Sequence, residues 1–326
     1  MEDQALLSIR NLHVHFYTGQ GIVRAVNGVN LSIHPGDAVG IVGESGCGKT
    51  MTALSILRLV PGPMGRIVEG EIRFDGKDIL ALPEAAMRKI RGNQISMIFQ
   101  DPMTSLNPVF TVGNQLAEVF RLHWKRLTKK EIRDRCVELL KVVEISMPEQ
   151  RIEQYPFELS GGIRQRVMVA SALACNPKIL IADEPTTALD VTIQAQILEL
   201  IHKLMVESKT AVILITHNLG LVAENTKRVI VMYAGKVVEE GPVDEMIDHP
   251  FHPYTQGLFR SIPRMAKDFS EMKERLLEIP GVVPSLTALP EGCTFGPRCS
   301  RRMEICEQKN PEMKEVGPDH HVWCWL

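Results

Sequence analysis

The residues best suited to chemistry lie in one glycine-rich stretch, GESGCGKT, which runs from Gly43 to Thr50. Its pattern, G-x-x-x-x-G-K-S/T, is typical of loops that bind nucleotide phosphates between a strand and a helix. Glycines let backbone N–H groups turn toward a β-phosphate, and the start of the helix adds positive potential. Lys49 offers a cation to the β- and γ-phosphate oxygens, and the Thr50 hydroxyl is a hard ligand for Mg²⁺. The residues predicted to bind ATP here are Gly43, Glu44, Ser45, Gly46, Cys47, Gly48, Lys49, Thr50 and Met51.

A pair of carboxylates follows a second apolar stretch, in the sequence KILIADEP from Lys178 to Pro185. Four apolar residues predict a buried strand, whose end would present Asp183 to the metal ion. Glu184 follows at once and is placed to polarise an attacking water molecule. On these residues alone, a helix N-cap arrangement stays open as the alternative.

Cys47 lies inside the predicted anion-binding loop and close to a helix N-terminus. Positive potential at such a place lowers the pKa of a thiol. We therefore expect Cys47 to react readily with alkylating reagents, and bound MgATP to protect it.

Four of the seven cysteines crowd the C-terminal end of the chain, with the spacing C-x5-C-x6-C-x17-C: Cys293, Cys299, Cys306 and Cys324. Four thiolates complete a tetrahedral site for either an iron–sulfur cluster (4Fe–4S) or structural zinc. His320 and His321 stand beside the last cysteine as competing ligands. Because the segment is short and polar, we expect it to need a bound metal centre in order to fold.

The elements that must position these residues are expected to alternate between strands and helices. Strand patterns cover 6–33 in two runs, 37–42, 71–74, 95–99, 179–182, 211–216 and a hairpin at 228–241. Helical patterns cover 49–60, a charged lobe at 112–143, 161–174, 191–205 and 219–224. This order predicts an α/β fold with a mostly parallel sheet, an antiparallel β region at the start and an inserted helical lobe. Beyond about residue 242 the chain is rich in proline, and it is expected to be irregular and to form a separate extension.

Charge and hydropathy exclude several classes of protein. The formal net charge is −2 and the isoelectric point is near 6.6, so the basic surface of a nucleic-acid-binding protein is not expected. The N-terminal stretch lacks the basic and apolar regions of a signal peptide. No apolar run approaches the ~20 residues that cross a bilayer.

The stretch LSGGIRQR, Leu159–Arg166, precedes the carboxylate motif and resembles the signature of ABC ATPases. The resemblance implies a P-loop NTPase core of ABC type with a RecA-like parallel sheet, spanning 1–242 with a helical subdomain at about 101–165. It also implies a dimer, in which Ser160, Gly161 and Gly162, with Gln165 nearby, face ATP held by the opposite subunit. Ile163 departs from the commonest pattern, which has glutamine there.

Other residues match motifs of the same family in the expected order. Gln100 resembles the Q-loop glutamine that contacts Mg²⁺ together with Thr50 and Asp183, and His217 resembles the histidine that contacts the γ-phosphate. Asp190 resembles the D-loop aspartate. The adenine is expected to stack on Tyr17, with Phe16 as the alternate, since strand alternation turns Phe16 toward the core.

The C-terminal sequence narrows the resemblance to one group of ABC ATPases. HPFHPYTQGLFRSIP, His249–Pro263, and the four cysteines are similar to the C-terminal region of dipeptide/oligopeptide transporter ATPases. This implies an extension at 243–326, and it favours the iron–sulfur cluster over zinc. It also implies a peripheral ATPase at the cytoplasmic face of the cell membrane. The implied partners are two permeases, a second and related ATPase, and an extracytoplasmic peptide-binding protein, with no nucleic acid.

Two other classes of function remain as rivals. An ABC-type ATPase that acts on DNA would carry a long coiled coil or zinc insert, but Ser160 follows Gln100 too closely to leave room for one. A soluble P-loop kinase would have no need for the LSGG stretch or for His217. The sequence does not identify the cargo, and it does not distinguish a homodimer from a heterodimer.

Overall fold

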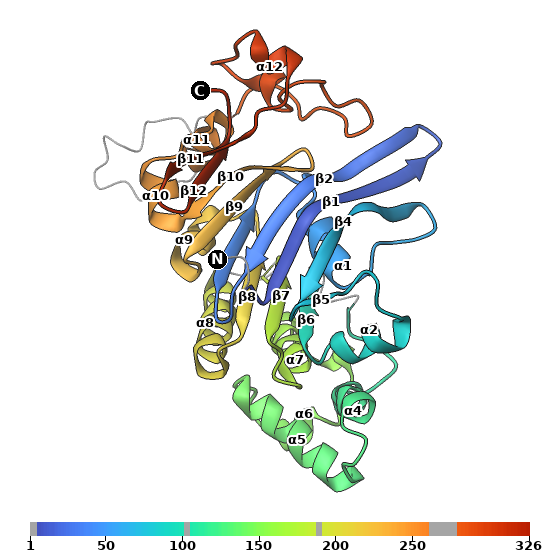
Figure 1. The fold of residues 1–326 in the computed structure, drawn as a ribbon. Helices are drawn as coiled ribbons and strands as arrows, with labels where there is room; N and C mark the ends of the chain where they lie inside the picture. Colours follow the sequence, from blue (N-terminus) through green and yellow to red (C-terminus); the bar gives the residue numbers. More distant parts are fainter. Residues whose placement is uncertain (1–4, 101–104, 187–190, 261–278) are drawn as a thin grey trace, which may run out of the picture. The chain divides into compact units, whose positions relative to one another are not determined.

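The structure is a computed structural model that describes residues 5–100, 105–186, 191–260 and 279–326. The chain forms two compact units, each made from separate stretches of the sequence. Among the described residues, the first unit comprises 33–37 and 81–214, and the second comprises 5–32, 38–80 and 215–326. Figure 1 colours the elements of both units by their place in the chain.

The first unit is built on three strands in the order β8-β7-β6. These are β6 (Ile95–Ile98), β7 (Ile179–Asp183) and β8 (Ala211–Ile215), whose last residue is counted with the second unit. β6 and β7 run parallel, and every residue of the three strands is buried, as parallel strands covered on both faces require. Its helical elements are α2 (Glu84–Ile90), α4 (Val112–His123), α5 (Lys129–Val142), α6 (Pro148–Arg151), the 3-10 turn η2 (Pro156–Glu158), α7 (Gly161–Leu173) and α8 (Val191–Ser208).

The predicted helical lobe is confirmed as the pair α4 and α5, which contact each other and α7. The Thr111 side chain accepts a hydrogen bond from the Asn114 N–H at the start of α4. At the start of α5, Thr128 and Glu131 form a reciprocal capping box. The caps set where each helix begins, while one apolar face of each helix is buried.

The second unit contains a four-stranded antiparallel sheet in the order β2-β1-β4-β5. Its strands are β1 (Leu7–Thr18), β2 (Gly21–Ile33), β4 (Gly65–Phe74) and β5 (Lys77–Asp78). β1 and β4 pair from Leu7 opposite Phe74 to Phe16 opposite Gly65, with a bulge in between. At the bulge Gly70 has φ of 110°, and a Cβ there would lie 2.6 Å from the Asn11 carbonyl oxygen, so the close approach requires glycine.

The other strands of this unit follow the order β11-β12-β10-β9-β3. β3 (Ala38–Val42) is parallel to β9 (Arg228–Tyr233), which forms the predicted hairpin with β10 (Lys236–Pro242). The two turn residues, Ala234 and Gly235, have φ of 46° and 83°, as a tight primed turn demands. The remaining elements are α1 (Lys49–Ile56), α9 (Leu219–Asn225), α10 (Val243–Asp248), α11 (Pro253–Arg260), the 3-10 turn η4 (Gly296–Arg298), α12 (Ile305–Gln308), β11 (Met313–Gly317) and β12 (His320–Trp323).

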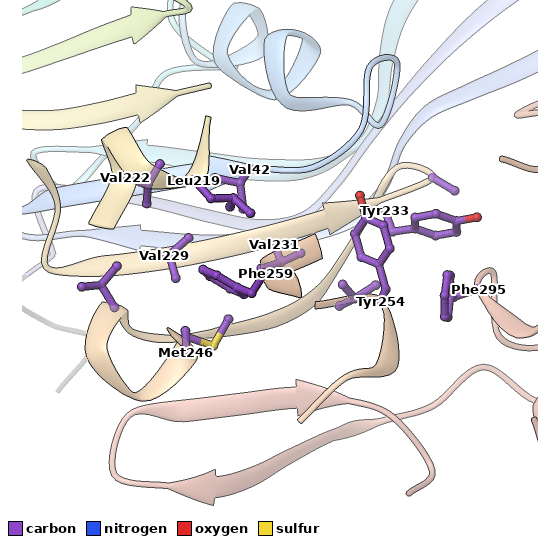
Figure 2. Packing of buried hydrophobic residues seen from close by; sticks show 13 residues of the cluster. Val42, Leu219, Val222, Val229, Val231, Tyr233, Met246, Tyr254, Phe259 and Phe295 are labelled. Carbon is purple, nitrogen blue, oxygen red and sulfur yellow. The ribbon is translucent and has the colours of Figure 1, made fainter. Parts of the chain in front are cut away.

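An apolar cluster in this unit joins the sheet to the C-terminal segment, residues 243–260 and 279–326, which follows β10 (Figure 2). Tyr233 at the end of β9 packs on Tyr254 of α11, with ring centroids 4.7 Å apart. Phe295, just before η4, meets the Tyr233 ring edge-to-face at 5.2 Å. Burial of a phenylalanine contributes about 2 kcal/mol or more, so this contact helps to fasten the segment to the sheet.

Three details differ from the sequence expectations. α1 ends at Ile56 rather than near residue 60, because Arg58 adopts a left-handed φ of 52°. β4 begins at Gly65, well before the expected start of the strand at residue 71. The segment beyond residue 242 was expected to be irregular, yet it supplies β12, which pairs with β10 at Glu239 and Glu240.

Candidate functional site

The phosphate loop of the second unit connects β3 to α1, as the motif predicts. Gly43 has φ of 147°, and a Cβ there would lie 2.2 Å from the Met232 carbonyl oxygen. Gly48 precedes α1 with φ of 106°, and its Cβ would lie 2.4 Å from the Ala25 carbonyl oxygen. Both positions therefore require glycine on two grounds, the backbone angle and the close approach of a neighbouring strand. The tip of the loop, Ser45 and Gly46, is exposed.

Lys49 is only 6% exposed and points back along the loop. Its Nζ donates hydrogen bonds to the carbonyl oxygens of Gly43, at 2.7 Å, and of Glu44, at 3.2 Å. The ammonium therefore sits within the loop, on the residues that are predicted to surround the phosphates.

The expected lowering of the Cys47 thiol pKa is wrong. The residue is 2% exposed, and burial raises the pKa of its thiol, while the attraction of Lys49 offsets only part of that rise. A Cβ on Gly43 would lie 2.8 Å from Cys47 Sγ, so the sulfur packs under the loop. The positive potential near Lys49 lowers the pKa of this thiol, but desolvation raises it more.

The carboxylate site of the first unit brings together two of the predicted residues. Gln100 follows β6 and Glu184 follows β7, each two residues beyond the parallel pair Ile98 and Ala182. Matching ends of parallel strands place their side chains at the same edge, and Gln100 Nε2 donates to Glu184 Oε2 at 3.0 Å. Glu184 has a left-handed φ of 46°, which turns the chain sharply after the strand. Asp183, the last residue of β7, is 2% exposed.

The signature stretch forms the start of α7. Ser160 is the N-cap residue, yet its side chain makes no capping hydrogen bond and is exposed. Gly161 and Gly162 follow in the first turn, so their N–H groups belong to the open end of a 13-residue helix, which favours an anion. Gln165 is different: it is 1% exposed and donates to the carbonyl oxygen of Pro185, which directly follows Glu184. Gln165 thus helps to hold the turn at Glu184 and Pro185 within its own subunit.

The remaining site predictions fall in several places. Tyr17 is 46% exposed near the end of β1, whereas Phe16 is partly buried. The Arg66 guanidinium lies 5.8 Å from the centre of the Tyr17 ring. His217 is exposed two residues after the end of β8, and it precedes Asn218, whose side chain caps α9. Asp190 lies outside the described residues.

Two C-terminal residues that contact the loop were missed by sequence reasoning. Tyr254 Oη accepts a hydrogen bond from the Glu44 N–H at 2.9 Å. Arg298 forms an ion pair with the Glu44 carboxylate at 2.8 Å. Neither residue belongs to a nucleotide-binding pattern, and both lie far along the chain from the loop, so no local signal could have found them.

The expected iron–sulfur site is not supported. Among the described residues, which include all four cysteines, no group of three or more potential ligands could hold a metal ion. Burial raises the pKa of the Cys293, Cys299 and Cys324 thiols. The same finding removes support for zinc at these cysteines.

The histidines named as competing ligands have other partners. His320 Nε2 lies 2.8 Å from Glu239 Oε1, and His321 Nδ1 lies 3.3 Å from Glu240 Oε1. The segment is also not held by its own residues alone. Strand β12 pairs with β10, and Phe295 enters the core of the second unit, so sheet pairing and apolar burial help to hold it.

In the described part of the chain, no helix combines the length and the apolar character that crossing a bilayer requires.

Two family models match the sequence. Residues 26–187 match the ABC transporter model, and residues 238–306 match the model of the oligopeptide/dipeptide transporter C-terminal region. The first match includes the phosphate loop and the carboxylate motif. The second begins in β10 and ends at Cys306.

Relatives are similar over nearly the full length. A probable peptide ABC transporter ATP-binding protein of Sinorhizobium fredii is 52% identical, over 98% of this chain and 94% of the relative. The oligopeptide transport ATP-binding protein OppD of Bacillus subtilis is 50% identical, over 98% of this chain and 88% of that protein. The dipeptide transport ATP-binding protein DppD of the same organism is 48% identical over 99% and 95%.

Solved structures share the fold. An ATP-binding cassette dimer in a post-hydrolysis state, bound to ADP and Pi, matches with a TM-score of 0.66 and 32% identity, covering 73% of this chain and 98% of that one. CbiO1 of Clostridium perfringens, part of an ABC transporter complex, matches with a TM-score of 0.63 and 26% identity, covering 76% and 92%.

Proposed function

From the premise that this chain belongs to the ABC transporter family, we propose that it hydrolyses MgATP at the Gly43–Thr50 loop and thereby drives membrane permeases that import peptides. The chain is the ATP-binding subunit of a peptide importer and has the cassette fold of ATP-hydrolysing relatives. The observation that carries the proposal is the loop itself, which combines strand, glycine turns and helix as nucleotide phosphates require. Roles for single residues extend this proposal.

In the loop, the backbone N–H groups and Lys49 bind the phosphates. Lys49 Nζ already lies on the carbonyl oxygens of Gly43 and Glu44, within reach of any phosphate that enters the loop. Tyr17, exposed near the end of β1, offers a ring face for the adenine. We assign the remaining loop residues to phosphate binding through their backbone, except Glu44, whose N–H donates to Tyr254 Oη and which helps to shape the loop.

For hydrolysis, Glu184 is the residue that accepts a proton from the attacking water molecule. Gln100, which donates to Glu184, orients that carboxylate and is also a candidate magnesium ligand. Thr50 and Asp183 complete the proposed metal ligands, because hydroxyl and carboxylate oxygens are what Mg²⁺ prefers. Bound Mg²⁺ would neutralise charge on the phosphates. His217 is the proposed contact to the γ-phosphate.

A dimer completes the site in this proposal. The start of α7, with Ser160, Gly161 and Gly162, carries N–H groups that the helix itself cannot satisfy. We assign them to the γ-phosphate of ATP held by a second ATPase subunit, and we assign Asp190 to the same interface. The dimeric cassette structure that resembles this chain supports the arrangement.

The proposed partners are two permease subunits, a related second ATPase and an extracytoplasmic peptide-binding protein. The match to the C-terminal region of oligopeptide/dipeptide transporters supports this set, and it supports a place at the cytoplasmic face of the membrane. The near-neutral net charge favours no nucleic-acid partner. Dipeptides and short oligopeptides are the proposed cargo class.

The test is reconstitution of the chain with its two permeases and its partner ATPase in proteoliposomes that contain MgATP. Labelled dipeptide supplied with the binding protein should accumulate only when ATP is present on the ATPase side. A complex with Lys49→Ala should assemble but not transport. ATPase activity that responds to DNA, and not to the permeases and the loaded binding protein, would refute the importer assignment.

A further inference from the structure

A side chain from the C-terminal segment forms hydrogen bonds and an ion pair with Glu44 of the phosphate loop. Arg298, at the end of η4, faces the Glu44 carboxylate with both of its terminal nitrogens. Nη1 lies 2.8 Å from Oε2, and Nη2 lies 3.1 Å from Oε1. The Arg298 side chain is 5% exposed and that of Glu44 is 27% exposed. A shielded, bidentate pair of this kind is stronger than an ordinary surface ion pair.

The rest of the guanidinium is fixed as well. Nε donates to the Pro280 carbonyl oxygen at 3.0 Å, and Nη2 also donates to that of Ile279 at 3.1 Å. Nη1 also donates to Tyr233 Oη at 3.4 Å. A guanidinium has five N–H donors, and these five contacts use all of them. Arg298 therefore cannot move away from the loop without breaking several hydrogen bonds.

The backbone of the loop is held at the same residue. The Glu44 N–H donates to Tyr254 Oη, and Tyr254 is fully buried against Tyr233. On the other side, the Glu44 carbonyl oxygen accepts from Lys49 Nζ. The N–H and the carboxylate of this one residue are thus bound by the C-terminal segment, and its carbonyl oxygen by the phosphate-binding lysine.

We infer that Arg298 is a positioning residue for ATP binding that acts through Glu44: it neutralises the only carboxylate within Gly43–Thr50. The inference rests on ATP binding at this loop, as proposed above. It assigns to the C-terminal segment a direct part in the nucleotide site.

The electrostatic reason is the sign of the ligand. ATP brings several negative charges into a loop that already carries the Glu44 carboxylate. With Arg298 in place the pair is neutral, so the field at the loop is set by Lys49 and the start of α1. Without Arg298 the bare carboxylate repels the phosphates, and the dissociation constant for ATP rises by about tenfold for charges on the order of 10 Å apart.

If Arg298 only held the loop in shape, the predicted results would differ, which allows a test. If Arg298 only holds the segment in shape, its removal affects all nucleotides alike, and a second change at Glu44 does not help. If it neutralises Glu44, the loss grows with the number of phosphates, and removal of the carboxylate reverses it.

The experiment measures equilibrium binding of a non-hydrolysable MgATP analogue, MgADP and AMP to the purified full chain. The variants are Arg298→Ala, Glu44→Gln and the double variant, with Arg302→Ala as the matched control. Arg302 lies shortly after the same turn and is half-exposed, with a 3.4 Å pair to Glu307. Thermal unfolding of each variant reports whether the chain is folded.

We expect Arg298→Ala to weaken binding of the ATP analogue about tenfold, MgADP less and AMP least. The double variant should return to within about threefold of wild type, and Arg302→Ala should match wild type. Wild-type affinity in Arg298→Ala, or a loss that Glu44→Gln does not reverse, would overturn the inference. If Arg298→Ala does not fold, Arg298→Gln takes its place, with the same order of losses expected for the analogue, MgADP and AMP; wild-type affinity in Arg298→Gln overturns the inference. A wild-type chain that binds no nucleotide would refute the proposed function instead.

Discussion

Acidification should destabilise the second unit through His252, whose ring is 1% exposed. Burial lowers the pKa of this imidazole from 6.5 to about 3. Its Nδ1 accepts a hydrogen bond from the Tyr254 N–H at 3.1 Å, which only an unprotonated Nδ1 can do. The backbone N–H of His252 donates to the buried Glu239 carboxylate at 2.9 Å. The neutral ring is therefore part of the packing beneath Tyr254.

The direction of the pH effect follows from proton binding. Between pH 6.5 and about 3 the unfolded chain binds a proton at His252 and the folded chain does not. The stability due to the neutral ring is thus fully present above pH 6.5 and is lost as the pH falls toward 3. From pH 7 to pH 5 the free energy of unfolding should fall by about 2 kcal/mol on account of this group alone.

The assay compares wild type with His252→Asn, because Asn Oδ1 keeps an acceptor for the Tyr254 N–H but does not titrate. A Trp124→Phe background removes the tryptophan of the first unit, so Trp323 and Trp325 report on the second. Urea unfolding at pH 7 and pH 5 should show the variant losing about 2 kcal/mol less than wild type. Equal losses in the two proteins would refute a neutral, buried His252.

Other expectations concern the site and its support. Glu184→Gln should bind MgATP with near-normal affinity and hydrolyse it about a hundredfold more slowly or worse, and turnover within a few-fold of wild type would rule out its role. Lys49→Ala should lose nucleotide binding in a direct titration, because the loop loses its cation. Cys47 should react with iodoacetamide more slowly than the half-buried Cys299, as mass spectrometry of timed samples would reveal; faster labelling of Cys47 would contradict its burial. Phe295→Ala should lower the free energy of unfolding of the second unit by about 3 kcal/mol, and a loss below about 1 kcal/mol would show that the ring is not anchored.

Sequence reasoning succeeded where the pattern is local. The apolar run before Gly43 and the helical spacing after Lys49 located the phosphate loop, because strand, turn and helix each have a local signature. The parallel ends of β6 and β7 then explain why Gln100 and Glu184, far apart in sequence, form a hydrogen bond.

It failed where structure depends on distant partners. The strands β11 and β12 are short and polar, with sequences MKEVG and HHVW, so no alternation marks them as strands. They exist because β10, which lies much earlier in the chain, offers a pairing edge. Likewise, desolvation of Cys47 depends on neighbours that the loop sequence does not contain.

The pairing of β10 with β12 also sets an order for folding during synthesis. Glu239 and Glu240 leave the ribosome before His321 and Val322, their partners in the sheet. At a synthesis rate of about 5–20 residues per second, the edge of β10 stays unpaired for roughly 4–16 seconds. Two glutamates and the closing Pro242 make this edge unattractive to other chains in the meantime. The Glu239 carboxylate gains partners early, since the N–H groups of residues 251 and 252 follow within about three seconds. The chain thus completes the sheet that carries its phosphate loop only when β12 has been made.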